Sequence, residues 1–140
     1  MPLQGHAIEF ENLKDAVNNS PYYRHLNIRL VEFTEEGCIM TMEMEESHLS
    51  VYGRTHGGAI ASLADCACSL ALATAIKESE FIATQSLNVH YISPVENGIL
   101  KAKGWIVHRG RHTAILEADL FDPSGNRVAH AHSVHVIREI

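Results

Sequence analysis

The run of residues from Gly57 to Ile76 constrains the fold of this chain more than any other segment. Across these twenty consecutive residues, GGAIASLADCACSLALATAI, the one charged side chain is Asp65. The other polar side chains of the run are small hydroxyls and two thiols. Alanine, leucine and isoleucine would occupy every side of a helix formed here, which is the pattern of a helix buried all round. The rest of the chain must therefore wrap around this segment.

A transmembrane helix is the obvious alternative, since the run is long enough to span a bilayer. However, the run is rich in alanine rather than leucine, contains Asp65, and is followed by strand-like sequence. We therefore expect a core helix and no membrane span. The N-terminal segment carries acidic residues early and does not resemble an export signal, so we expect a cytoplasmic protein.

Asp65 is the first candidate catalytic residue. An ionised carboxylate among apolar side chains is costly unless it is paired, hydrogen-bonded or open to water in a cleft. Carboxylates tuned by burial are typical acid/base or nucleophilic groups. A structural aspartate that bonds a backbone amide inside the core stays open as the alternative.

The remaining sequence predicts one α+β domain over residues 1–140. A short helix is expected at Phe10–Asn18 and the long helix at about residues 57–77. Period-two patterns between turn-forming residues predict six strands, at His25–Thr34, Cys38–Glu45, Ile82–Ile92, Ile99–Arg109, His112–Phe121 and Arg127–Ile137. A six-stranded antiparallel sheet wrapped around the long helix would bury that helix. Such a sheet leaves open edges, which dimerisation would close.

Charge and cysteine content narrow the function classes. The formal net charge of −6 argues against non-specific nucleic-acid binding, which needs a basic surface. The three cysteines, Cys38, Cys66 and Cys68, are odd in number and lack metal-ligand spacing, so we expect free thiols. Cys66 adjoins Asp65 but has no adjacent base in the sequence, which favours core packing over a nucleophilic role.

Histidines could suggest a metal site. His130 and His132 share one strand face, and His135 is close to both in the sequence. No acidic or thiol ligand, of the kind that completes many zinc sites, lies beside them in the sequence. We therefore expect no metal and no other cofactor.

Three motifs resemble one known family, the hotdog-fold acyl-CoA thioesterases. The first is Gly53-x-x-His56-Gly57-Gly58-Ala59-Ile60-x-x-Leu63-Ala64-Asp65, the second Leu87-Asn88-Val89-x-Tyr91-Ile92-Ser93-Pro94, and the third surrounds residues 108–113. The likeness extends over residues 20–138 and is strongest to the phenylacetate-pathway thioesterases and their 4-hydroxybenzoyl-CoA thioesterase relatives. It implies a hotdog fold and metal-independent hydrolysis of an acyl- or aryl-CoA thioester to the free acid and CoA.

The resemblance also implies roles for individual residues. Asp65 would act as nucleophile or as general base on water, and the Gly57 backbone amide would polarise the thioester carbonyl. Amides at a helix start lack intrahelical partners and carry the positive end of the helix dipole. Ser69 matches the hydroxyl that holds the attacking water, and Thr84 falls where some relatives have an active-site hydroxyl. Packing roles remain open for both, and His56 is expected to orient its loop rather than act as a base.

One position departs from the family pattern. Six residues before His56 the family usually has Asn or Gln, whereas this chain has the shorter Ser50. A non-catalytic acyl-CoA-binding module on the same fold therefore stays open, although binding alone needs no buried Asp65. A hotdog dehydratase is disfavoured because no acid pairs with a histidine in the helix region.

A basic turn is the candidate contact for the coenzyme A phosphates, because guanidinium groups suit phosphate recognition. A solvated turn is the alternative, and an acyl carrier protein remains possible as the carrier. The candidate substrate-binding residues are Arg109, Gly110, Arg111 and Thr113 on this turn, together with Gly58 and His90.

The spacing of the two principal groups predicts an assembly. Asp65 follows Gly57 by eight residues, about 12 Å along a helix at about 1.5 Å per residue. One carbonyl cannot contact both groups of the same helix, so Gly57 and Asp65 would come from different protomers. We expect a homodimer with shared active sites, assembled further into a tetramer.

Overall fold

The computed structural model describes residues 10–140, with side chains from residue 12 onward. The order of elements is a helical N-terminal part, two strands, the long helix and four strands, as the sequence predicts. In chain order they are α1 (Phe10–Asn18), α2 (Pro21–Leu26), β1 (Ile28–Phe33), β2 (Gly37–Glu43), η1 (Glu46–His48), α3 (Gly57–Ala73), β3 (Glu80–Tyr91), β4 (Ile99–Arg109), β5 (Thr113–Phe121) and β6 (Arg127–Glu139).

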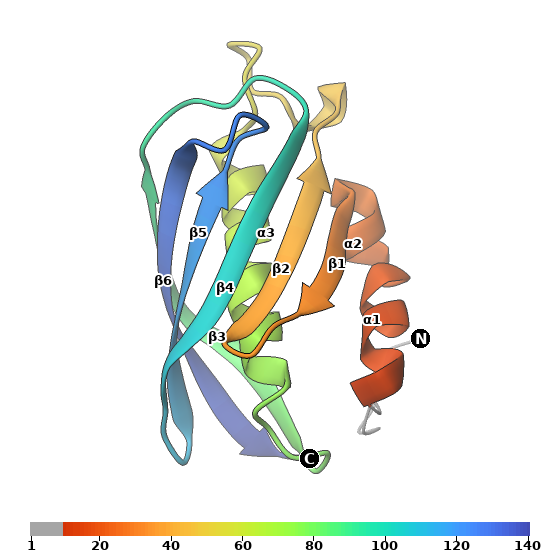
Figure 1. Ribbon diagram of the computed structural model, residues 1–140, viewed down its shortest axis with the longest axis vertical. Coiled ribbons are helices and arrows are strands. Elements are labelled where there is room, and N and C mark those ends of the chain that lie inside the picture. The colour runs from red at the N-terminus through yellow and green to blue at the C-terminus, as the bar shows by residue number, and fades with distance from the viewer. Residues whose placement is uncertain (1–9) are drawn as a thin grey trace.

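The six strands form one sheet in the order β1-β2-β4-β5-β6-β3, in which all neighbours are antiparallel. The sheet curves around α3, which packs against β2, β3, β4, β5 and β6 (Figure 1). A six-stranded antiparallel sheet on a central helix is the hotdog fold, and the expected architecture is confirmed.

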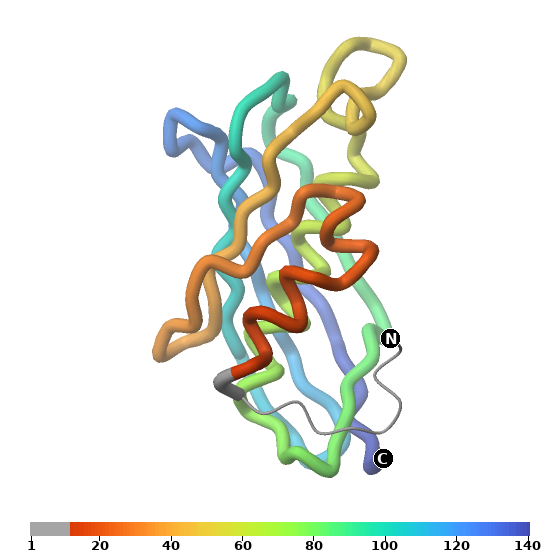
Figure 2. Tube along the Cα trace, turned by 90° about the vertical axis from the view of Figure 1, so that its right-hand side faces the viewer, coloured from red at the N-terminus to blue at the C-terminus, as the bar shows by residue number. Residues whose placement is uncertain are grey.

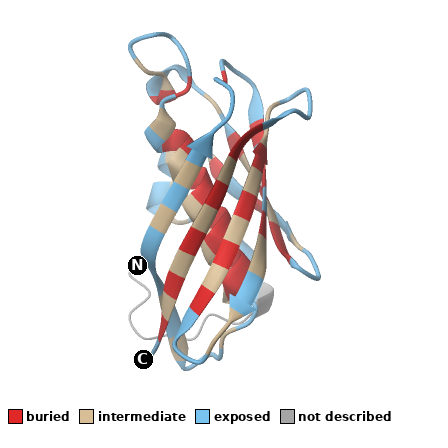
Figure 3. Cartoon of the chain, turned by 90° about the vertical axis from the view of Figure 1, so that its left-hand side faces the viewer, coloured by how far each residue is buried: buried red, intermediate tan, exposed pale blue. Residues whose placement is uncertain are grey.

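The core lies between α3 and the concave face of the sheet. On α3 the fully buried side chains include Leu63, Ala67 and Leu72, and Met40 and Leu116 face them from the sheet. Along β5 and β6 buried residues alternate with partly buried ones, as Figure 3 shows. One face of the sheet therefore packs against the helix, and the other is partly accessible to solvent.

Glycine lets the helix and the sheet approach closely at one point. A Cβ atom on Gly104 of β4 would collide with the Ala67 carbonyl of α3, and one on Gly37 would collide with Gly104. The Cys38 thiol also donates to the Ala67 carbonyl, at 3.2 Å. The middle of α3 therefore rests directly on the backbone of β2 and β4.

The structure corrects the sequence-based bounds at one element. Residues 25 and 26 were expected to begin a strand, but they end a short helix, α2. Pro21 at the first turn suits a helix start because its fixed φ is already helical. Asn27 ends α2 in the left-handed conformation, at φ 57°, and β1 begins immediately after it.

Bounds of other elements also differ from the predicted ones, and β2 ends at Glu43 rather than Glu45. Helix α3 ends at Ala73 with Thr74 as its C-cap, a few residues before the predicted end. Strands β3 and β6 extend two residues further than predicted at one end, where Glu80 pairs with Glu139. Apolar composition continues past the helix end because Ile76 still packs against the core.

Helices α1 and α2 pack on β1, and α2 also contacts α3 (Figure 2). The Tyr22 hydroxyl of α2 bonds the Ser62 hydroxyl of α3, at 2.7 Å. Strand β3 forms the opposite edge of the sheet and is exposed along most of its length (Figure 3). Within the described part of the chain, no helix is long and apolar enough to cross a membrane.

Candidate active site

The carboxylate of Asp65 lies half-buried on α3, near the exposed edge strand β3. The Thr84 hydroxyl of β3 donates a hydrogen bond to Asp65 Oδ1, at 2.7 Å. Within residues 12–140, no protein donor bonds the second carboxylate oxygen, Oδ2. One oxygen of the carboxylate is thus held in place while the other is available to water or to a ligand.

The pairing of β3 with β6 positions Thr84. Thr84 lies directly opposite His135, and the register shifts immediately afterwards, so that Ser86 lies opposite Val134. A bulge of this kind re-aims side chains and often occurs beside active sites. Here it follows the residue whose hydroxyl contacts the carboxylate.

His135 lies beneath this pair and is fully buried on the inner face of β6. Its Nε2 is 2.8 Å from the Ser69 hydroxyl and 3.2 Å from the Thr84 hydroxyl. Its Nδ1 is 3.2 Å from the Ser133 hydroxyl. Asp65, Thr84, Ser69, His135 and Ser133 therefore form one hydrogen-bonded cluster from α3, β3 and β6.

Counting protons assigns the tautomer of His135. Thr84 has one hydroxyl hydrogen, which it donates to the carboxylate, an acceptor when ionised. Toward His135 the Thr84 oxygen can then only accept, so Nε2 carries the imidazole hydrogen. In that tautomer Nδ1 has no hydrogen and is the acceptor toward the Ser133 hydroxyl. The single Nε2 hydrogen is then shared between the Thr84 and Ser69 oxygens, which leaves the Ser69 hydrogen to donate toward the site.

Burial favours the neutral imidazole that this network requires. Desolvation lowers the pKa of His135 below its ordinary value, because the charged form loses its hydration. The negative charge of Asp65 acts in the opposite direction and offsets part of that effect. A neutral His135 can donate at Nε2 and accept at Nδ1 at the same time.

The start of α3 forms a second group of candidate residues. His56 is the N-cap, and its Nδ1 accepts from the Gly58 amide at 2.8 Å. The Tyr91 hydroxyl donates to the Gly57 carbonyl at 2.7 Å. Gly57, as the first residue of the helix, has an amide without an intrahelical acceptor. Tyr91 and His56 thus hold the backbone around that amide.

Two other candidate residues lie apart from the Asp65 cluster. Ser50 lies in the loop between η1 and α3, where its hydroxyl accepts from the Tyr52 amide at 3.3 Å. His90 is exposed on β3 and lies opposite His130. Within one protomer, neither residue bonds the carboxylate of Asp65.

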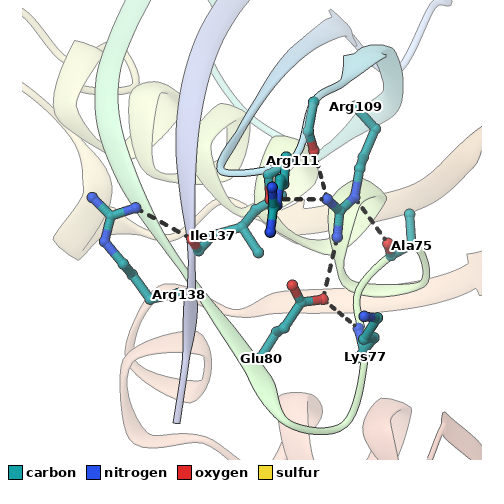
Figure 4. Close-up of polar contacts among 8 residues, drawn as sticks. Ala75, Lys77, Glu80, Arg109, Arg111, Ile137 and Arg138 are labelled. Carbon is teal, nitrogen blue, oxygen red and sulfur yellow. Dashed lines mark hydrogen bonds and ion pairs between the residues drawn. The ribbon is translucent and has the colours of Figure 1, made fainter.

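The basic turn is a third separate group, and Arg109 is largely occupied there (Figure 4). Its guanidinium lies 3.2 Å from Glu80 and also donates to the carbonyls of Gly110, Arg111 and Ala75. These contacts tie the turn to the start of β3. Arg111 and Thr113 are exposed, so they are the groups on this turn that a phosphate could reach.

The thiols are buried and free, as expected for all three cysteines. Burial raises the pKa of Cys66 to about 11, with Asp65 adding to the rise. Cys38 and Cys68 are each raised to about 12, again mainly by burial. A neutral thiol is a poor nucleophile, so the environment of Cys66 suits packing rather than catalysis.

Comparison with known proteins identifies the family. The model of the thioesterase superfamily matches residues 52–129, more than half of the chain. The chain belongs to the thioesterase superfamily. The matched segment includes the start of α3, the basic turn and the Asp65–Thr84 pair, and it ends before Ser133 and His135.

Relatives of this superfamily are similar over most of the chain. A putative esterase of Bacillus subtilis is 30% identical over 98 residues, which cover 69% of this chain and 78% of that protein. A 1,4-dihydroxy-2-naphthoyl-CoA hydrolase of Listeria monocytogenes is 24% identical over 97 residues, or 69% and 79% of the two chains. A thioesterase structure from Haemophilus influenzae has a TM-score of 0.86 at 23% identity and covers 96% of this chain and 95% of its own.

Three residues of this superfamily member were missed as site residues in the sequence. His135 was considered only as a zinc ligand with His130 and His132, but it occupies the inner face of β6 while those two lie on the outer face. Ser133 and Tyr91 carried no predicted role. The sequence did contain one indication of a site here: Ser133 and His135 lie two residues apart and so share a strand face that is otherwise apolar.

Proposed function

We propose that the protein hydrolyses acyl-CoA thioesters. The observation that carries the proposal is the half-buried Asp65, which has one oxygen bonded by Thr84 and the other unbonded within residues 12–140. A structural aspartate would use both oxygens to satisfy nearby donors. A half-buried carboxylate with one free oxygen is arranged to meet water or substrate.

The hydrolysis uses Asp65 in one of two ways. As a general base, Asp65 takes a proton from water while the water oxygen attacks the thioester carbonyl carbon. The C–S bond then breaks, and the proton passes to the departing thiolate. As a nucleophile, Asp65 Oδ2 attacks the carbonyl carbon, the C–S bond breaks and CoA leaves as the thiolate. Water then hydrolyses the mixed anhydride, which releases the acid, restores the carboxylate and supplies the proton that the thiolate takes up. In both cases Thr84 holds the carboxylate, and Ser69 can donate to the water through its free hydrogen.

The Gly57 amide of a second copy would stabilise the oxyanion. A backbone amide at a helix start is a strong donor for developing negative charge. Tyr91 supports this role because its hydrogen bond to the Gly57 carbonyl fixes the peptide in place. The carbonyl would thus lie between Asp65 of one protomer and Gly57 of the other.

The proposed carrier is coenzyme A, and its phosphates would lie near Arg111 and Thr113. Both side chains are exposed, and Arg109 beneath them keeps the turn in shape through Glu80. The Listeria relative, by its name, acts on a CoA thioester. That relationship supports coenzyme A over an acyl carrier protein for this chain.

Asp65→Asn is the decisive variant. It preserves the size of the side chain and removes its charge, so the fold should persist while turnover falls about a hundredfold or more. The measurement is thiol release from acetyl-, octanoyl-, palmitoyl- and phenylacetyl-CoA, with circular dichroism as the check on folding. Ser62→Ala, on the same helix and outside the cluster, serves as the matched control.

Two outcomes would contradict the proposal. Near-normal hydrolysis by folded Asp65→Asn would remove the carboxylate from the mechanism. Tight binding of acyl-CoA by the unchanged protein without any hydrolysis would instead favour a binding module, the alternative that Ser50 keeps open.

A further inference from the structure

Beside the Asp65 cluster lies a cavity of about 920 Å³. Helices α1 and α2 form one wall, the C-terminal half of α3 another, and the start of β3 the third. Ser69 and Thr84 line it as well, and both belong to the cluster around Asp65. The cavity therefore reaches the hydroxyl that bonds the proposed catalytic carboxylate, although Asp65 itself does not line it.

The lining of the cavity is almost entirely apolar away from those two hydroxyls. Leu13 and Val17 of α1 face Leu70, Ala73 and Ile76 of α3 and its C-terminal extension. Of the described residues that line it, Glu139 alone is charged, and Glu139 is exposed near the chain end. An apolar lining of this size is typical of small-molecule sites.

The remaining polar groups on the walls already have partners. The Ser20 hydroxyl donates to the Val17 carbonyl at 2.8 Å. The Tyr23 hydroxyl interacts with the Cys66 thiol, and burial raises the pKa of Tyr23 far above its ordinary value. Neither group can therefore receive a charged ligand, and burying an unpaired charge there would be costly.

We propose that this cavity is the acyl-binding chamber, and that it selects uncharged, apolar acyl groups of medium to long length. The inference rests on the proposed function, because it assigns the acyl half of the same substrate. From the carbonyl at Asp65 an acyl chain would run along α3 past Ser69 to Ala73. Eight helical residues separate Asp65 from Ala73, which is about 12 Å.

This geometry makes Ala73 the specificity-determining residue. A small side chain there leaves the far part of the chamber open, toward Ile76 and Leu13. A phenylalanine at the same position would fill that part while leaving the Asp65 end unchanged. Short acyl groups would then still bind, and longer ones would be excluded.

Binding of non-hydrolysable thioethers tests the chamber without depending on catalysis. S-octyl-CoA should bind the unchanged protein on the order of 100-fold more tightly than S-methyl-CoA, since each methylene removed from water adds affinity. Ala73→Phe should weaken S-octyl-CoA binding about tenfold or more and leave S-methyl-CoA binding unchanged. Ala75→Phe is the matched control, because Ala75 is exposed and does not line the cavity.

A second variant covers the case in which Ala73→Phe fails to fold. Leu13→Ser, on the opposite wall, should weaken the binding of S-octyl-CoA in the same manner and leave the binding of S-methyl-CoA unchanged. Equal affinity of the unchanged protein for the two thioethers would contradict the proposed chamber. Equal effects of Ala73→Phe and Ala75→Phe on S-octyl-CoA binding would contradict it as well. Hydrolysis of octanoyl-CoA is measured separately, so loss of the catalytic proposal and loss of the chamber are distinguishable.

Discussion

At the scale of single residues, His135 determines how the hydrogen-bonded cluster around Asp65 is protonated. Its Nε2 contacts both hydroxyls beside Asp65, those of Ser69 and Thr84, and its ring is fully buried. If Nε2 keeps its hydrogen, Thr84 must give its own hydrogen to the carboxylate. His135 is thus a positioning residue, because it acts on Asp65 through Thr84.

The buried imidazole predicts a loss of stability in mild acid. Burial lowers the pKa of His135 in the folded state below the unfolded value of about 6.5. Between the two pKa values the unfolded chain binds more protons, so the free energy of unfolding rises with pH. This contribution is complete above about pH 6.5 and is lost as the pH falls through the folded-state pKa.

Urea unfolding at pH 7.5 and pH 5.5 measures this effect. The unchanged protein should lose more stability between the two values than His135→Gln, whose amide can donate but does not titrate. The same variant should lower kcat more than it raises KM, since Thr84 loses part of its orientation. An identical pH dependence of unfolding in both proteins would show that His135 makes no titrating contribution.

Asp65 and Gly57 could be proposed as site residues from the sequence because each belongs to a pattern that neighbouring residues define. A lone charge in an apolar run and a glycine pair at a helix start are visible without a fold. His135 had no such signal, because its role depends on the register that places it opposite Thr84. Tyr91 was likewise out of reach, since its partner Gly57 is 34 residues away in the sequence.

At the scale of elements, the closest contact between α3 and the sheet depends on Gly104. Its missing side chain allows the Ala67 carbonyl to rest against β4. Because the obstacle is backbone rather than a flexible side chain, an added methyl group has no space. The whole helix would have to move, and Asp65 lies on the same helix.

Gly104→Ala is therefore expected to be destabilising. Overpacking of this kind typically costs about 1–3 kcal/mol of unfolding free energy, and a backbone obstacle favours the upper end. The urea midpoint is the measurement, and Lys103→Ala on the exposed side of β4 is the control. A Gly104→Ala protein as stable as the control would show that the helix can move away from the sheet without cost.

The elements themselves were largely predictable, and the exception has a physical cause. Period-two patterns located all six strands, because each strand alternates between the helix-facing side and the outer side. Helix α2 was missed since its six residues, PYYRHL, show no apolar period. Its tyrosines contact α3 instead, and that contact exists only in the folded chain.

At the scale of the whole molecule, one protomer leaves two features incomplete. Strand β3 is a 12-residue edge strand that is exposed along most of its length. Such edges are usually covered or paired, because their free amides and carbonyls invite another strand. Gly57 and Asp65 also lie about 12 Å apart along α3, too far to share one carbonyl. A second copy that pairs along β3 would resolve both.

Subunit exchange tests this shared site. Asp65→Asn and Gly57→Val should each be inactive alone, the first without its carboxylate and the second with its amide obstructed. A Cβ at Gly57 would lie at an ordinary contact distance from the Tyr91 ring, 3.4 Å, and circular dichroism checks that the larger valine side chain leaves the fold intact. In a hybrid dimer one site combines the intact Asp65 of one chain with the intact Gly57 of the other. Random exchange makes half of the dimers hybrid, so about a quarter of normal activity should return. A verified exchange that restores no activity would mean that each active site lies within a single protomer.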